Sequence, residues 1–249
     1  MNFRRTTLFF ASLILLLGIL FQGFSISLWW LLIPIHIYLL ILVLGAIYIQ
    51  HNFYLKSRNN LTPHHEKQIM LTFDDGIHAE FTPIILDALK EKNVRAMFFL
   101  IGKNIPGNEG IVARMLNEGH TIGNHSYSHG MWFDLKSVRA MVSEILQTNG
   151  LLESISGMPV RYFRPPYGVT NPNVARAVRQ SGLISVGWSL RSMDTVATSE
   201  VALLQKLKSG TFPGCIVLLH DRCEVTSKVL TDYIDYCKDQ GYTFVTLNS

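Results

Sequence analysis

Residues 68–76 read Gln-Ile-Met-Leu-Thr-Phe-Asp-Asp-Gly, an apolar and β-branched run that stops at two carboxylates and a glycine. A run of this composition, closed by turn residues, predicts a β-strand. Strands with so few polar positions are typical of parallel sheets that helices cover on both faces. The two carboxylates are therefore expected at the edge of a sheet, where α/β proteins place their functional residues.

The chain beyond this stretch repeats an alternation of strand and helix patterns. Apolar or β-branched runs predict seven strands, at residues 68–73, 95–101, 121–123, 160–163, 183–188, 215–219 and 242–246. Helix patterns lie between them, with candidate first residues at Thr82, Asn108, Ser137, Asn171, Ser199 and Thr226. Strict alternation implies a parallel sheet, either open and doubly wound or curled into a barrel. Seven strands in roughly 180 residues favour an α/β fold of the small, incomplete barrel type.

The first fifth of the chain has the composition of a membrane segment. Residues 7–24 and 28–49 carry no charged side chain, and Trp29 and Trp30 stand where the second segment begins. As a helix, each segment is long enough to cross a hydrocarbon core of about 30 Å. The alternative is a signal peptide, but its apolar core spans only about 7 to 15 residues. We therefore expect a retained transmembrane hairpin.

Three parts follow along the chain: a transmembrane anchor over residues 1–50, a polar linker over 51–67 and a soluble domain over 68–249. Arg4 and Arg5 are the only charged residues of the anchor. The positive-inside rule places them in the cytoplasm, and two crossings would return the chain to the same side. If only the second segment spans, or if the N-terminus lies outside, the soluble domain lies outside the cytoplasm, so the sequence leaves its side open.

Charge and cysteine content exclude two classes of function. After Arg4 and Arg5, the chain carries 20 basic and 18 acidic side chains, a net charge of +2, which does not favour a nucleic acid as partner. The three cysteines, Cys215, Cys223 and Cys237, are too few for a disulfide framework or a cysteine-based zinc site. At most one disulfide is expected.

Polar residues cluster directly after the predicted strands. Five strand ends carry them: Asp74 and Asp75, His125 and His129, Arg164 to Gly168, Asp194, and His220 and Asp221. Taken alone, each group has an ordinary explanation as a turn, a surface histidine or a structural ion pair. Because the carboxyl ends of parallel strands share one rim, their joint placement predicts a single site. Four other histidines lack this placement, and we interpret them as membrane, linker or loop residues: His36, His64, His65 and His78.

Two imidazoles and a carboxylate form the ligand set of a catalytic zinc site, which activates a bound water. His125, His129 and one of the paired aspartates can supply these ligands. The other aspartate is then free to accept the proton of that water as general base. His220, on the opposite side of a scissile carbonyl, can protonate the leaving group. This division of roles favours hydrolysis of an amide or ester.

The motifs together resemble the NodB-homology polysaccharide deacetylases, carbohydrate esterase family 4. The matching segments are Thr72 to Gly76, His125 to His129, Arg164 to Gly168, and Leu218 to Asp221. They occur in the family's order over residues 68–246. The resemblance implies a distorted (β/α)₇ barrel, and a catalytic domain over residues 68–249.

The resemblance also implies a role for each site residue. A zinc ion, or another divalent metal such as Co²⁺ or Ni²⁺, would be held by Asp75, His125 and His129. Asp74 would be the base and Arg164 would hold it by an ion pair. The Tyr167 backbone N–H would bind the oxyanion and contact the substrate, and Leu218 would line the acetyl pocket. His220 would be the general acid, and Asp194 would orient it.

One motif departs from the family pattern. Many members read Asp-x-x-Asp-Trp after a tryptophan-bearing strand, whereas this chain has Arg191, Asp194 and Thr195 at those three positions, after Trp188. A nearby carboxylate raises the pKa of a histidine, so Asp194 can still support His220. The missing tryptophan would wall a substrate subsite, and the glycan preference is therefore not inherited.

The expected protein is a membrane-anchored, metal-dependent deacetylase of N-acetylated amino sugars in peptidoglycan, a chitin-like glycan or poly-N-acetylglucosamine. Its expected partners are that glycan and membrane lipid, and its catalytic domain is expected outside the cytoplasm, at a bacterial-type cell envelope. Two alternatives stay open: a deformylase or deacetylase of a lipid-linked sugar, and a carbohydrate-binding pseudoenzyme. Loss of a metal ligand or of the base would favour the pseudoenzyme, and the sequence shows no such loss.

Overall fold

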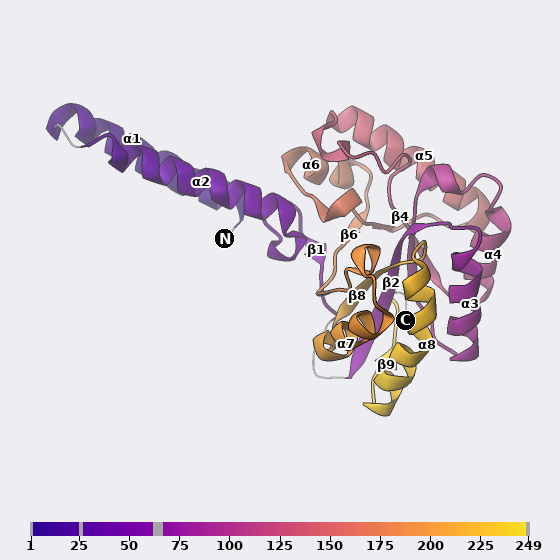
Figure 1. Ribbon diagram of the computed structural model, residues 1–249. Helices are drawn as coiled ribbons and strands as arrows, with labels where there is room; N and C mark the ends of the chain where they lie inside the picture. The colour runs from indigo at the N-terminus through magenta and orange to yellow at the C-terminus, as the bar shows by residue number, and fades with distance from the viewer. Residues whose placement is uncertain (1, 25–26, 62–66, 248–249) are drawn as a thin grey trace.

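The computed structural model describes residues 2–24, 27–61 and 67–247 (Figure 1). The α-helices are α1 (Phe3–Phe24), α2 (Trp29–Ile47), α3 (Phe81–Glu91), α4 (Glu109–Asn117), α5 (Val138–Ser156), α6 (Pro172–Gln180), α7 (Glu200–Gly210) and α8 (Glu224–Asp239). The strands are β1 (Ser57–Arg58), β2 (Gln68–Gly76), β3 (Met97–Leu100), β4 (Thr121–Asn124), β5 (Tyr162–Phe163), β6 (Ile184–Val186), β7 (Leu190–Arg191), β8 (Ile216–His220) and β9 (Thr243–Phe244). Short 3₁₀ turns lie between them, at Ile49–His51, Gly102–Asn104, Phe133–Leu135, Pro166–Gly168 and Asp194–Val196.

The strands form one curled parallel sheet in the order β1-β6-β5-β4-β3-β2-β8-β7, and β9 pairs with β2. All seven predicted strands are present, and the predicted incomplete (β/α)₇ barrel is confirmed. Strands β1 and β7, which have two residues each and form the two edges of the sheet, were not predicted from the sequence. The segment predicted as a linker thus supplies an edge strand, β1, beside β6. His64 and His65, which we interpreted as linker residues, lie outside the residues that the structure describes.

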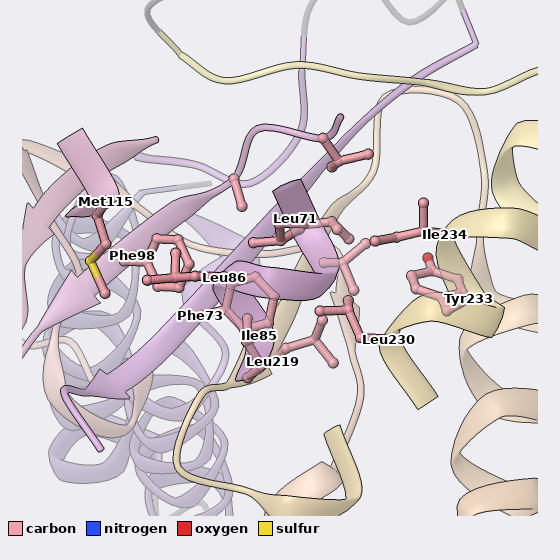
Figure 2. Close-up of a cluster of buried hydrophobic side chains, with 14 of the residues drawn as sticks. Leu71, Phe73, Ile85, Leu86, Phe98, Met115, Leu219, Leu230, Tyr233 and Ile234 are labelled. Atoms are coloured by element: carbon pink, nitrogen blue, oxygen red, sulfur yellow. The ribbon is translucent and has the colours of Figure 1, made fainter. Parts of the chain in front are cut away.

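The residues of the central strands alternate between two apolar layers, because successive side chains of a strand point to opposite faces. One layer packs under the helices, as Figure 2 shows for Leu71 and Phe73 of β2 beside Ile85 of α3 and Leu230 of α8. The other layer fills the inside of the curl, with Met70 of β2 among its members.

This alternation sets which polar groups point into the barrel. On β2 the inner positions are Met70, Thr72 and Asp74, and on β8 they are Ile216 and Leu218, followed by His220. In the register of these neighbouring strands, Asp74 lies opposite His220. The strand that decides the fold therefore also delivers its first carboxylate to the inner rim.

The predicted helix starts are correct where the side chain is free to cap. Ser137, Asn171 and Ser199 each accept a hydrogen bond from a backbone N–H of the first turn, and Asn108 precedes α4 without such a bond. Two predicted starts are wrong. Thr82 lies inside α3 and Thr226 lies inside α8, and both hydroxyls donate instead to buried carboxylates.

Helices α1 and α2 form an antiparallel pair that projects from the domain beside β1 (Figure 1). Both are long and apolar enough to cross a membrane, over Phe3–Gly23 and Trp29–Ile47. The Thr7 and Tyr38 hydroxyls lie 2.9 Å apart, and the rings of Phe10 and Tyr38 stack between the two helices. These contacts fit the predicted hairpin.

The open end of the hairpin is fastened to the domain. The Thr170 N–H donates to the Ala46 carbonyl at 2.9 Å, and the Phe3 N–H donates to the Phe53 carbonyl at 3.1 Å. Ile49, two residues after the end of α2, is 1% exposed and belongs to the inner apolar layer of the barrel. The three cysteines are free thiols, so no disulfide contributes to these connections.

Candidate active site

A cavity of about 420 Å³ opens at the carboxyl ends of the strands. Seven of the predicted site residues line it: Asp74, Asp75, His125, His129, Tyr167, Leu218 and His220. Arg164 and Asp194 lie behind its wall, each 2% exposed or less. A larger hollow of about 1130 Å³ lies beside residues 50–61, but its described lining contains neither a histidine nor an acidic residue. The smaller cavity is therefore the candidate active site.

Asp75, His125 and His129 form a cluster that could hold a metal ion, with ligand atoms within 4.8 Å of one another. Asp75 Oδ1 lies 3.6 Å from His125 Nε2 and 3.4 Å from His129 Nε2. The other ring nitrogen of His125, Nδ1, lies 2.7 Å from the Arg164 carbonyl oxygen. A carbonyl only accepts, so Nδ1 is the donor, and in the neutral ring Nε2 then carries the lone pair that a metal binds.

The electrostatics of the cluster also suit a divalent cation. Burial alone would raise the pKa of Asp75, but hydrogen bonding and charge from His125, together with Arg222, hold it well below its usual range. Burial, and then the charge of His125, lower the pKa of His129 to about 4. At neutral pH the cluster thus offers an ionised carboxylate and a neutral His129 imidazole, which are the protonation states of metal ligands.

The second carboxylate, Asp74, is held apart from this role. Its Oδ1 accepts a hydrogen bond of 2.7 Å from Arg164, whereas its Oδ2 lies 3.8 Å from His125 Nε2 and faces the metal cluster. Arg164 is fully buried and also donates to the Thr72 hydroxyl and to two backbone carbonyls, while its guanidinium lies 4.2 Å from the Phe99 ring centre. A buried charge needs partners of this kind, and here they leave Arg164 one orientation.

His220 stands across the cavity and is held by Asp194. The two side chains meet at 2.7 Å between His220 Nδ1 and Asp194 Oδ1, and Asp194 Oδ2 accepts the His220 backbone N–H, also at 2.7 Å. Burial lowers the pKa of His220, but the hydrogen bond and charge of Asp194 outweigh it and raise the pKa above its ordinary value. His220 is thus favoured in its protonated form.

The backbone around the cavity is strained. Asp75, Ser126, His129 and Tyr167 all have positive φ angles, between 48° and 72°, which non-glycine residues rarely adopt. Such conformations persist where surrounding contacts enforce them, and they concentrate at functional sites. Glycine is required beside them at Gly168, whose φ is +70° and where a side chain would collide with the Trp188 ring.

Four further side chains support the site and were not predicted from the sequence to have a role in it. The Thr72 hydroxyl accepts a hydrogen bond from Arg164 and donates to the Val217 carbonyl. Thr226 donates to Asp194, and Arg222 donates to Asp75 Oδ2 at 2.8 Å. Asp221 is fully buried, accepts from the Thr82 hydroxyl, and has its pKa raised by burial to about 7. The spacing of Thr72, two residues before Asp74 on the same face of a strand, was the available signal; the other three depend on tertiary contacts.

The divergent motif contributes to the same cavity. Trp188, Arg191 and Thr195 line it, and the Arg191 guanidinium lies 5.9 Å from the Trp188 ring centre. Arg191 is not among the hydrogen-bond partners of Asp194 in the described structure, so it does not compete with His220. Among the other histidines, His36 lies in α2, and His78 precedes α3 and stacks on Phe81.

Comparisons with known proteins agree with this architecture. A family model described as polysaccharide deacetylase matches residues 62–186. The chain is 35% identical over 191 residues to a peptidoglycan-N-acetylglucosamine deacetylase of Bacillus cereus, covering 75% of this chain and 69% of that protein. It is 33% identical over 189 residues to the peptidoglycan-N-acetylmuramic acid deacetylase PdaA of Bacillus subtilis, covering 74% and 71%.

A solved structure of a CE4-family pseudoenzyme from Bacillus anthracis superposes with a TM-score of 0.71 and 27% identity, over 76% of this chain and 66% of that one. The family therefore includes at least one member named for lost activity, and fold alone does not decide function. The matched segment, the two curated relatives and the curled sheet point to one conclusion: the chain belongs to the polysaccharide deacetylase family, whose enzymes are hydrolases.

Proposed function

We propose that this chain is a divalent-metal-dependent deacetylase of the N-acetylated amino sugars of peptidoglycan. One observation carries the proposal: a single cavity holds the Asp75, His125 and His129 cluster between a clamped carboxylate and a protonatable imidazole. The names of the two curated relatives support N-acetylglucosamine or N-acetylmuramic acid as the sugar.

A Zn²⁺ ion fits the cluster, which supplies two imidazoles and one carboxylate, and Co²⁺ or Ni²⁺ would accept the same donors. Such an ion lowers the pKa of a bound water and polarises the acetyl carbonyl. Asp75 presents Oδ1 to both histidines, and its Oδ2 is held by Arg222. Orientation of a ligand by a second partner is typical of functional metal sites.

In the proposed reaction, Asp74 is the general base. Arg164 occupies Oδ1 and so leaves Oδ2 free to take a proton from the attacking water. As the water oxygen bonds to the acetyl carbon, negative charge develops on the carbonyl oxygen, beside the backbone N–H that we assign to Tyr167. Leu218, at the cavity wall, would contact the acetyl methyl group.

His220 is the proposed general acid. It donates a proton to the amine nitrogen as the carbon–nitrogen bond breaks, which releases acetate and leaves a free amino sugar. Asp194 keeps the imidazole oriented and protonated until that step. A positioned acid or base of this kind contributes about 10² to 10⁴-fold to a rate.

Two other functions compete with this proposal. A pseudoenzyme is disfavoured because the three possible metal ligands lie together, Asp74 is paired with Arg164, and His220 is paired with Asp194. A deacetylase or deformylase of a lipid-linked sugar is favoured by one observation, the apolar hairpin fastened beside the cavity-bearing domain. It differs from the main proposal in substrate and not in chemistry.

The test measures acetate release and bound metal in the same preparations, with peptidoglycan fragments and chitooligosaccharides as substrates. Asp75→Ala, His125→Ala and His129→Ala should each lose the metal and the activity. Asp74→Asn should keep the metal and lose at least about 10²-fold in kcat/KM, because only the base is removed. If Asp74→Asn emptied the site as fully as Asp75→Ala, the division between the two carboxylates would be wrong.

We further propose that the hairpin anchors the catalytic domain at the outer face of a cytoplasmic membrane, where peptidoglycan lies. The two helices are about 33 and 28 Å long, close to a hydrocarbon core of about 30 Å. Arg4 and Arg5 oppose this orientation, since the hydrogen bond from Phe3 to Phe53 places the start of α1 at the same end of the hairpin as the domain. A reporter fused after Ser249 should be active only outside the cytoplasm; activity only inside would favour a lipid-linked substrate at the inner face.

A further inference from the structure

Two cationic side chains, Lys103 and Arg191, line the catalytic cavity and have no role in the proposed reaction. Both are exposed, and neither has an acidic partner in the part of the chain that the structure describes. The two aspartates that line the cavity already have cationic partners, because Asp74 pairs with Arg164 and Asp75 pairs with Arg222. The rim therefore carries two unpaired positive charges.

Arg191 is held close to the proposed acetyl pocket. It lies on β7 opposite Leu218 of β8, and directly paired residues of parallel strands point to the same face. Its guanidinium rests against the Trp188 ring, which also lines the cavity. Stacking on an aromatic ring orients a guanidinium without using its hydrogen-bond donors, so these are free for a ligand.

Lys103 approaches the cavity from the 3₁₀ turn after β3. Its backbone N–H donates to the Tyr127 carbonyl at 3.0 Å, and the side chain of its neighbour Asn104 donates to the Asp75 carbonyl at 3.2 Å. The turn is thereby fixed to the metal cluster on one side and to the loop of the two histidines on the other. A flexible ammonium on a fixed turn suits an anion of variable position.

We propose that Lys103 and Arg191 bind an anionic substituent next to the acetamido group of the substrate sugar. The carbon that bears the acetamido group is flanked by two ring carbons, one that carries a lactyl ether in muramic acid and one that carries phosphate in activated sugars. A carboxylate or phosphate at either position would lie beside the acetyl pocket. The inference rests on the proposed function. Binding of the anion by these two side chains makes the enzyme selective for charged over neutral N-acetyl sugars.

The experiment compares substrates of equal length that differ in one anionic group. A muramic-acid-containing oligosaccharide is tested beside its lactyl methyl ester, and N-acetylglucosamine 1-phosphate beside N-acetylglucosamine. The proteins are the metal-loaded full chain, Arg191→Gln, Lys103→Gln and the control Arg179→Gln, whose side chain is exposed on α6 outside the cavity. The readout is the ratio of kcat/KM for the charged substrate to that for its neutral partner.

We expect a ratio of at least about 10 for the wild type and for Arg179→Gln, and a several-fold smaller ratio for Arg191→Gln and Lys103→Gln. The ratio should also fall as salt rises. A preference for the lactyl pair identifies a carboxylate as the anion, and a preference for the phosphate pair identifies a phosphate. Equal rates on both members of each pair, or ratios unaffected by the two variants, would overturn the inference and leave the proposed deacetylase intact. Absence of turnover on every substrate would instead contradict the proposed function.

Discussion

Asp194 shows how a single buried carboxylate organises one half of the candidate site. It is 2% exposed and accepts hydrogen bonds from the side chains of His220, Ser192 and Thr226 and from the His220 backbone. These donors outweigh the opposing effect of burial and lower the pKa of Asp194, so it stays ionised. A fixed negative charge in a site of low polarity acts strongly on the imidazole beside it.

This coupling predicts a pH shift in Asp194→Asn. Asp194 raises the pKa of His220, so removal of this carboxylate should lower that pKa. His220 should then lose its proton at a lower pH than in the wild type. In log(kcat/KM) plotted against pH, the alkaline limb should move to lower pH while the metal stays bound. An unmoved limb would contradict the role of Asp194.

Arg191→Ala is the matched control for this measurement. Arg191 lies three residues away and is not bonded to Asp194 in the described structure, so the limb should keep its position in this variant. A shift to higher pH would show that the guanidinium competes for Asp194.

At the scale of the elements, the sequence predicted the strands best where they are central and long. The end of the apolar run placed Asp74 and Asp75 at the rim of the sheet, and the helices begin at Ser137, Asn171 and Ser199 as expected. The helix starts predicted at Thr82 and Thr226 were wrong, because a hydroxyl near a helix start caps the helix only when no buried carboxylate is within reach. Such acceptors, like the two-residue edge strands, arise from tertiary structure that local patterns do not contain.

His120, between α4 and β4, should make the free energy of unfolding depend on pH. Its Nδ1 accepts the Ala96 N–H at 3.1 Å, its Nε2 has no hydrogen-bond partner in the described structure, and burial lowers its pKa to about 4. The unfolded chain, with a histidine pKa near 6.5, binds more protons between pH 4 and 6.5. This contribution to stability is therefore present above pH 6.5 and is lost as pH falls towards 4.

The measurement is the free energy of unfolding by urea, from pH 7 to pH 4, for the full chain in detergent. His120→Asn keeps an acceptor for Ala96 but cannot be protonated, so it should remove up to about 3 kcal/mol of the decrease. His51→Asn, at an exposed histidine, should follow the wild type. Equal pH dependence in His120→Asn and the wild type would mean that other groups cause the decrease.

At the scale of the whole molecule, the hairpin and the domain are joined by specific contacts and not by a free tether. Composition alone predicted two apolar helices, but not that Thr170, in the loop after the proposed oxyanion residue Tyr167, would bind the last turn of α2. Nor did it predict that Ile49 would enter the same apolar layer as Trp188. These contacts join residues far apart in the chain. They fix the direction in which the cavity faces relative to the hairpin.

Gly45 is the position at which this connection can be tested. It lies in the last turn of α2, and a side chain there would collide with the Phe53 ring. Gly45→Leu should therefore displace Phe53 and open the connection, at a cost of about 1–3 kcal/mol for an overpacked contact. Gly18→Leu is the matched control, because Gly18 lies in α1 of the same hairpin and has open space around it.

The opening is measured by trypsin cleavage after Lys56 and Arg58, two exposed residues that β1 and the connection hold against the domain. Because local opening governs cleavage, 1.4 kcal/mol corresponds to a tenfold faster cut, and Gly45→Leu should be cleaved about tenfold faster than Gly18→Leu. Turnover of a soluble oligosaccharide should be similar in the two variants, since neither glycine lines the cavity. When each variant is inserted in lipid vesicles, turnover of a substrate anchored in the same vesicles should fall in Gly45→Leu alone. If both variants were cleaved at the same rate, the contacts at the end of α2 would not be what fixes the domain to its anchor.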